Sequence, residues 1–247
     1  MAEAIAAEVG ATIWDQGNLV GFDLETTGTD PLSARVVTAA VVHHQRDDAL
    51  GAHSQRWLVD PGMDIPEPAT AVHGITTAYA REHGEAAAPA VEAIAEALTE
   101  AWCAGLPIVI FNAAYDLTLL NAELLRYGNV PLTERRGWAD ALIIDPLVID
   151  RAVDRYRRGK RTLQDAARHY EIVATDAHSA DGDAIATCRL ARAIAARYPE
   201  IAAATPAALR SQQQVWSTEW AVRFQAFLRS RGESDAVIDG TWPLRVR

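Results

Sequence analysis

Two carboxylates leave the same side of an apolar segment that runs from Leu19 to Gly28. Side chains alternate between the two faces of a β-strand, so Asp23 and Glu25 should point together while Leu24 points into the core. Two ionised carboxylates at close range repel each other by about 4 kcal/mol at an effective dielectric constant near 20, unless a cation lies between them. The pattern therefore predicts a strand that carries a Mg²⁺ or Mn²⁺ site, with solvated acids on an edge strand as the alternative.

Three further segments carry polar groups that could join this site. An apolar run from residue 107 gives way to a helical pattern at Asp116, which places a third carboxylate at a junction between strand and helix. His178 and Asp183 stand just before and at the start of another helical pattern, with a loop between them that allows both side chains to converge. A short apolar turn over residues 71–76 contains His73 and predicts the lip of a pocket.

Together these segments resemble the DnaQ-like 3′→5′ exonucleases, in the branch called DEDDh after its four acids and one histidine. The resemblance covers about residues 16–198 and is carried by Phe22–Gly28, by Asn112–Asp116, and by His178 followed by Asp183 after four intervening residues. Two departures, Phe111 before the Asn-Ala pair and the Glu67-Pro68 order, bear on substrate preference rather than on the reaction.

The resemblance implies hydrolysis of a phosphodiester with two divalent ions, Mg²⁺ or Mn²⁺, in each site. Two such ions about 4 Å apart activate the attacking water and stabilise the leaving oxygen. His178 is implied to be the general base, and its ordinary pKa near 6.5 suits that role. The implied metal ligands are Asp23, Glu25, Asp116 and Asp183, and the implied substrate contacts are Leu24, Thr26, Thr27, His73, Asn112 and Tyr115.

Three functions stay open at this point. The first is release of nucleoside monophosphates from the 3′ ends of single-stranded DNA, in proofreading or repair. The second is the same chemistry on RNA 3′ ends, as in ribonuclease T or oligoribonuclease, and the third is a catalytically silent binding module. The Thr26-Thr27-Gly28 turn resembles the proofreading branch and favours DNA. The five intact catalytic positions argue against the binding module.

The hydrophobic pattern predicts an α/β fold, which the resemblance specifies as a ribonuclease H-like mixed five-stranded sheet flanked by helices. Three early strands joined by short turns indicate an antiparallel meander, and the later alternation of strands and helices indicates parallel crossovers. The strands are expected near residues 18–24, 35–44, 54–59, 107–111 and 141–144, and the helices near 89–104, 115–127, 162–170 and 181–197.

Residues 199–247 lie outside the resemblance and are expected to form a helical C-terminal extension. The segment from Pro206 to Arg231 predicts one long helix, with Trp216, Trp220 and Phe224 spaced by four along one face. This stripe either packs on the domain formed by residues 16–198 or contacts a polymerase or a second copy of the chain. Residues 239–244 are expected to fold back as a terminal turn.

Composition limits the partners and the compartment. A formal net charge of −10 argues against a broad basic face for duplex DNA. The exception is the basic run Arg151–Arg161, which is expected as a loop. This run either is simply solvated or steers a phosphate backbone. Cys103 and Cys188 stand apart in apolar helical segments, which predicts buried thiols in a reducing compartment. Because no signal segment or long apolar run is evident, we expect a cytoplasmic protein without a membrane span.

Overall fold

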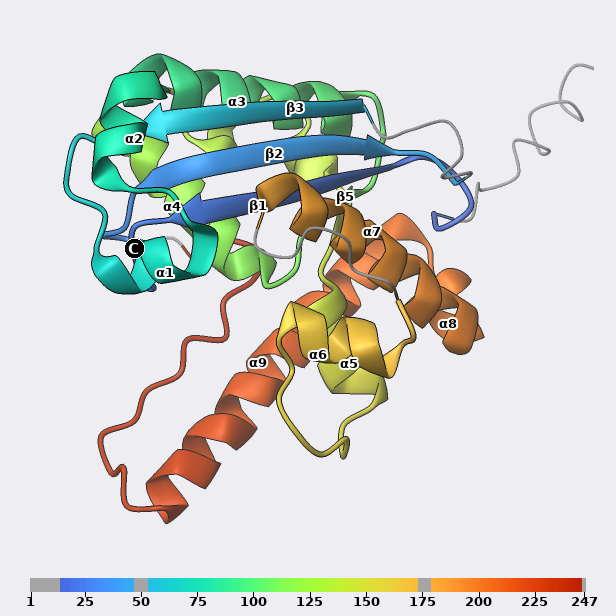
Figure 1. Cartoon of the computed structure of the whole chain (residues 1–247). Coiled ribbons are helices and arrows are strands. Elements are labelled where there is room, and N and C mark those ends of the chain that lie inside the picture. The colour runs from blue at the N-terminus through green and yellow to red at the C-terminus, as the bar shows by residue number, and fades with distance from the viewer. Residues whose placement is uncertain (1–13, 47–52, 173–178, 246–247) are drawn as a thin grey trace, which may run out of the picture.

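The computed structural model describes residues 14–46, 53–172 and 179–245, which form one mixed sheet with helices on both faces (Figure 1). In the order of the sheet, its strands are β4 Glu85–Ala86, β3 His53–Asp60, β2 Val36–His44, β1 Leu19–Thr26, β5 Ile108–Val109 and β6 Ile143–Ile144. The antiparallel meander of β1, β2 and β3 is confirmed, as is the parallel pairing of β5 with β1 and β6. The sheet has six strands rather than five, because the two-residue β4 joins its edge by backbone pairing alone and leaves no apolar pattern to recognise.

Within the described residues, the structure contains the five helices that the sequence predicts, to within two residues at each end, and four further short ones. The helices are α1 Glu67–His73, α2 Thr77–His83, α3 Ala87–Cys103, α4 Ala113–Arg126, α5 Pro146–Val153, α6 Leu163–His169, α7 Ala180–Arg197, α8 Pro199–Ala202 and α9 Pro206–Ser230. The prediction of a turn over residues 71–76 was wrong in part, since α1 continues through His73 and ends at Gly74, whose φ of 77° suits glycine.

Two layers of apolar packing place β1 in the middle of the molecule. One face of the strand carries Val20, Phe22 and Leu24 into the core against α3 and α4, as the alternation predicted for Leu24. The other face lies under α7, where Ala184 packs with residues of β2. Asp23 belongs to this second face, so the first carboxylate of the motif points toward the start of α7.

The C-terminal residues return to the sheet after helix α9. Helix α9 extends away from the sheet, and the chain then runs back from its far end toward α1 and α4 (Figure 1). Trp242 and Leu244 are buried in the main hydrophobic core, which confirms that this segment folds back, although its backbone is irregular rather than a turn. Of the aromatic stripe on α9, Trp216 packs against the core, whereas Phe227 beyond it is 55% exposed.

Two smaller expectations have different outcomes. Cys188 is buried as predicted, but Cys103 is exposed, because it lies in the last turn of α3 where the helix leaves the core. Within the described parts of the chain, no helix combines the length and the apolarity that crossing a bilayer demands.

Candidate active site

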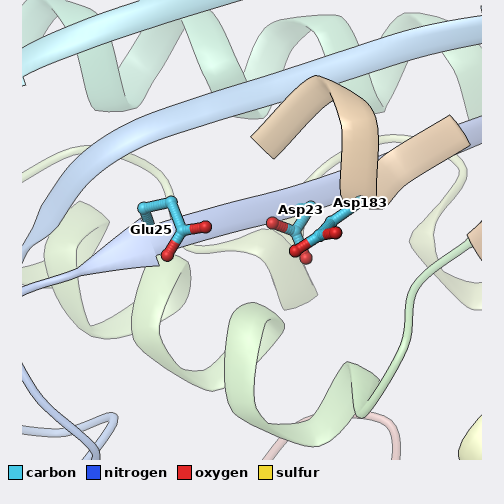
Figure 2. A group of neighbouring side chains, drawn as sticks. All are labelled: Asp23, Glu25 and Asp183. Carbon is cyan, nitrogen blue, oxygen red and sulfur yellow. The ribbon is translucent and has the colours of Figure 1, made fainter. Parts of the chain in front are cut away.

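Three carboxylates meet where β1 passes beneath the first turn of α7. Asp23 and Glu25 project from one face of the strand and Asp183 comes from the helix, as Figure 2 shows. One carboxylate oxygen from each of the three residues lies within 4.8 Å of the other two. The alternation along β1 and the helix start at residue 180 therefore bring together three of the four predicted metal ligands.

A glycine in β1 sets how closely α7 approaches these acids. A Cβ atom at Gly21 would lie 2.5 Å from the carbonyl oxygen of Ala184 and 3.0 Å from the Sγ of Cys188. The contact is to backbone, so it cannot be relieved by rotating a side chain. Gly21 thus permits the close packing that carries Asp183 to Asp23.

We expect Gly21→Ala to lower both activity and stability. The added methyl group should push α7 outward and cost about 1–3 kcal/mol of folding free energy, as overpacking does. Since a misplacement of about 1 Å at a reacting group can cost about 10²-fold in rate, the reaction rate should fall by about that factor. Thermal melting and initial reaction rates measure both effects. A variant with normal rate and normal stability would contradict this role for Gly21.

The fourth predicted ligand, Asp116, approaches from the other side of the strand. It lies in the first turn of α4 and is only 4% exposed, and the backbone N–H groups of Leu24 and of Asp116 itself oppose the rise in its pKa. Asp116 is outside the group of three close oxygens, yet its charge helps to raise the pKa of Asp23. Its effect on Asp23 exceeds those of Asp183 and Glu25, so Asp116 belongs electrostatically to the same cluster.

Burial and mutual repulsion make the cluster hold protons when no cation is present. Burial, followed by the charges of Asp116 and Asp183, keeps the pKa of Asp23 well above its usual range. Burial also raises the pKa of Asp116, and burial together with Asp183 raises the pKa of Glu25 to about 7. A set of hard oxygen donors that repel one another suits a divalent cation such as Mg²⁺ or Mn²⁺.

The raised pKa of Glu25 predicts how stability depends on pH. Because the folded protein binds this proton more tightly than the unfolded chain, its stabilising effect is complete below about pH 4.5 and is lost as pH rises through about 7. We expect the Tm in EDTA to fall between about pH 5 and 8, and the increase in Tm caused by Mg²⁺ to grow over the same interval as cation replaces proton. Glu25→Gln should flatten the profile in EDTA, and an unchanged slope in that variant would contradict the assignment.

All six predicted substrate contacts line one hollow beside the acids. This hollow, of about 800 Å³, is bordered by the end of β1, by α1 and by the start of α4. It also contains Glu25, so it opens directly onto the carboxylate cluster. The six residues are Leu24, Thr26, Thr27, His73, Asn112 and Tyr115.

Several of these side chains also hold the wall of the hollow in place. The Thr27 hydroxyl accepts a hydrogen bond from the backbone N–H of Arg35 at 2.9 Å. The Tyr115 hydroxyl lies 2.6 Å from the Thr26 hydroxyl and donates to the carbonyl of Gly28, while burial raises its pKa to about 12. These contacts fix the turn after β1 and leave the ring of Tyr115 on its surface.

The structure describes His73 but not His178, the two histidines predicted for the site. His73 ends α1 and accepts a hydrogen bond at Nδ1 from the backbone N–H of Ile75 at 3.1 Å. Burial lowers its pKa, which favours the neutral ring at physiological pH. His178 lies outside the described residues, so its role as general base stays a prediction.

A family comparison decides what kind of site this is. A family model described as Exonuclease, of the RNase T type, matches residues 20–191. The chain belongs to this exonuclease family. The match confirms the resemblance to DnaQ-like exonucleases and spans every acid of the cluster.

Individual relatives of this exonuclease are distant. A DNA polymerase III subunit epsilon-like protein of Rhodobacter capsulatus is 34% identical over 115 residues, which are 46% of this chain and 16% of that protein. The DNA polymerase III subunit epsilon of Rickettsia felis is 26% identical over 125 residues, 50% of this chain and 52% of its own. The chain thus spans only a small part of the first relative and about half of the second.

Solved structures show the same fold. E. coli Exonuclease I in complex with a dT13 oligonucleotide aligns with a TM-score of 0.59 at 22% identity, over 75% of this chain and 42% of that chain. Exonuclease I from Methylocaldum szegediense aligns with a TM-score of 0.60 at 23% identity, over 74% and 41% of the two chains. The exonuclease therefore has the ribonuclease H-like architecture that the resemblance implied.

The candidate site also contains a cationic side chain that the sequence did not predict. Arg56, on β3, borders a second hollow of about 470 Å³ together with Glu25, His73 and Ser179. Its guanidinium pairs with Asp181 at 2.5 Å and remains 65% exposed. The sequence offers little to distinguish Arg56, because arginine is common at outward-facing positions of strands near the edge of a sheet. Asp181 lies in the first turn of α7, which is capped by Ser179.

A buried carboxylate behind the site was also missed as a structural hub. Asp145, 1% exposed, accepts hydrogen bonds from the backbone N–H groups of Asn112 and Ala113 at 3.0 and 2.9 Å. It also caps α5 and accepts a hydrogen bond from the Trp242 indole at 3.2 Å. Burial raises its pKa, and these donors oppose that rise. Asp145 thereby fixes the turn at Asn112, where φ is 66°, and with it the start of the helix that carries Asp116.

Proposed function

We propose that the chain is a metal-dependent 3′→5′ exonuclease that releases nucleoside monophosphates from the 3′ ends of single-stranded DNA. The observation that carries this proposal is the meeting of Asp23, Glu25 and Asp183 within 4.8 Å, beside the hollow that holds all six predicted substrate contacts. Membership of the exonuclease family supports the reaction class. The intact acids argue against a silent binding module.

The acids divide naturally into two sets of ligands. Asp23, Glu25 and Asp183 would hold one divalent ion, and Asp116, together with the shared Asp23, would hold the second. Bound Mg²⁺ or Mn²⁺ supplies charge neutralisation at the attacked phosphate and at the leaving oxygen. The protein supplies the fixed positions, because one acid comes from a helix packed on Gly21 and another from a helix set by Asp145.

The hollow suits the end of a nucleic acid strand. Its volume of about 800 Å³ is within the range of about 300–1,000 Å³ that small-molecule sites occupy, and matches one or two nucleotides better than a duplex. Leu24 and Val72 offer apolar surface for a base, while Asn112 offers an exposed amide for polar atoms. Neutral His73, whose Nδ1 already accepts from Ile75, can donate a hydrogen bond from Nε2 without adding charge.

A matched-substrate time course tests the proposal. End-labelled single-stranded DNA, single-stranded RNA and mismatched duplex are incubated with Mg²⁺, with Mn²⁺ or with EDTA. We expect stepwise shortening from the 3′ end, fastest on single-stranded DNA, with mononucleotides as product and no reaction in EDTA. Faster loss from RNA would assign the ribonuclease T-like alternative. Internal cuts, or no cleavage with either cation, would overturn the proposal.

His178 gives a further prediction, which rests on the sequence motif alone. If it accepts the proton of the attacking water, activity should rise with pH through its pKa, since only neutral imidazole can act as a base. His178→Ala should lower turnover by about 10² to 10⁴, with little change in the affinity for metal or DNA. Saturation kinetics from about pH 5.5 to 9 provide the measurement. Turnover and a pH profile equal to those of the unmodified chain would remove His178 from the mechanism.

A further inference from the structure

The basic run Arg151–Arg161, expected as a loop, is held in a defined conformation. Its first part, up to Val153, is the end of α5, and the segment that follows is fastened to the buried carboxylate of Asp150. Arg157 and Arg161 reach Asp150 Oδ2 at 2.5 and 2.6 Å, and the Tyr170 hydroxyl donates to its other oxygen at 3.0 Å. The position of this segment is thus set before any partner arrives.

Arginines and aromatic rings alternate where this segment meets α9. The guanidinium of Arg151 lies 3.6 Å above the ring of Trp220, and that of Arg155 lies 5.4 Å from the ring of Tyr156, which is 84% exposed. A shallow hollow of about 160 Å³ runs between them. We call its lining the arginine–aromatic surface, and it consists of Arg151, Arg155, Tyr156, Arg161, Trp220 and Arg223.

Charge singles out this surface within the chain. Residues 151–161 contain six basic residues and one acidic residue, in a protein whose formal net charge is −10. The other cation of the surface, Arg223, comes from α9, which packs on α5 (Figure 1). A local concentration of guanidinium groups in an acidic protein attracts a polyanion, and the exposed ring of Tyr156 beside them can stack with a base.

The surface is continuous with the proposed active site. An intermediate hollow of about 370 Å³ shares Asn112 with the hollow beside the acids, and shares Arg151 and Trp220 with the arginine–aromatic surface. The carboxylate of Asp239 in this intermediate hollow is paired with Arg245 at 3.6 Å. A strand whose 3′ end lies at the acids therefore has a lined path to the basic surface.

We propose that the arginine–aromatic surface binds the upstream part of the single strand whose 3′ end occupies the active site. This inference rests on the proposed function and names a second contact region for the same substrate. The guanidinium groups of Arg155 and Arg223 bind phosphates, and the exposed ring of Tyr156 presents a face to the bases, while Trp220 holds Arg151 in place. Binding is independent of base sequence, because neither contact reads a base edge.

Fluorescence anisotropy in EDTA tests this surface without hydrolysis. The affinity of the unmodified chain for oligothymidylate should rise with length from a dinucleotide to about fifteen nucleotides, a span within the site sizes of single-strand binders. The double variant Arg155→Gln/Arg223→Gln should lower the slope of log affinity against log salt by about 1.4, at about 0.7 for each phosphate contact. That change corresponds to about a 25-fold loss of affinity at 0.1 M salt.

Matched variants separate a specific surface from a change in net charge. Arg136→Gln/Arg168→Gln removes the same charge at two exposed positions that border none of the three hollows, and should leave the slope unchanged. Tyr156→Ala should weaken binding of the long strand about tenfold, whereas Tyr156→Phe should retain it through stacking. Equal Tm values for all variants establish that each one is folded.

Two failures can be told apart. If the double surface variant binds like the double control variant, the arginine–aromatic surface is overturned, whatever the chain hydrolyses. If the unmodified chain binds long strands in this manner but never shortens them with Mg²⁺ or Mn²⁺, the proposed exonuclease function is overturned and the binding surface stands.

Discussion

Asp23→Asn should abolish hydrolysis and at the same time raise the Tm of the metal-free protein. Loss of one ligand removes several kcal/mol of stabilisation of the reacting phosphate, and about 4 kcal/mol corresponds to about 10³-fold in rate. The same change relieves repulsion among three carboxylates whose oxygens lie within 4.8 Å. Each ionised pair at that distance costs about 3 kcal/mol at an effective dielectric constant near 20, before protonation relieves part of it.

The net stabilisation should be about 1 kcal/mol at pH 8, because the raised pKa of Asp23 already relieves most of the repulsion. In a chain of this length that corresponds to a rise in Tm of about 2–4 °C in EDTA. The increase in Tm caused by Mg²⁺ should disappear. Asp183→Asn should gain less, since its charge also favours the N-terminus of α7.

The exposed acid Asp140 provides the matched control for these substitutions. Asp140→Asn removes the same charge away from the cluster and should change neither rate nor Tm. Differential scanning calorimetry in EDTA and in Mg²⁺, with initial rates on labelled single-stranded DNA, gives all the values. If Asp23→Asn and Asp183→Asn both unfold without metal, these residues are structural and the metal assignment is wrong.

Asp145→Ala should be among the most destabilising substitutions in the chain. Its carboxylate accepts from the backbone N–H groups of Asn112, Ala113, Leu147 and Val148 and from the indole of Trp242. Removing a buried acceptor of this kind costs about 3–5 kcal/mol, because its donors are left without partners. The Tm should fall by roughly 10 °C, and activity should fall as the start of α4 moves with Asp116.

Two companion variants show whether the hydrogen bonds carry this effect. Asp145→Asn keeps one acceptor oxygen and should lose about half as much stability as the alanine variant. Gln213→Ala should cost about 2 kcal/mol, because the buried Gln213 amide accepts from the backbone N–H of Asp145 at 2.7 Å and donates to the carbonyl of Ile143 at 2.9 Å. Chemical denaturation measures all three. If the free energy of unfolding of Asp145→Ala lies within about 1 kcal/mol of that of the unmodified chain, Asp145 is not a structural hub.

The parts of the fold that the sequence predicted are those with strong local periodicity. Alternation along residues 19–26 identified both the strand and the face that carries its acids, and long apolar patterns identified α3, α4, α7 and α9. Helix α1 escaped notice because it buries none of its residues and contains Pro68, so no apolar stripe marks it. Helix α5 was missed although Asp145 and Pro146 form a recognisable cap and first turn, because the residues before them form an apolar strand.

The candidate site shows the same division. Its acids and its six wall residues could be named because motif spacing determines them. Arg56 and Asp145 could not, since their importance depends on partners distant in sequence: Asp181 for the first, and Asn112 and Trp242 for the second. The basic run was recognised by composition alone, and only the packing of α5 on α9 showed that Arg151 lies against Trp220.

The burial of Trp242 and Leu244 in the main core has a consequence for biosynthesis. A chain that emerges from the ribosome can form β1 to β6 early, but the core against α4 stays open until residues 242–244 have left the exit tunnel. We therefore expect the nascent exonuclease to pass through a stage in which its sheet exists while Asp145 still lacks its tryptophan donor. Chaperones that recognise exposed apolar surface would have their opportunity during this interval.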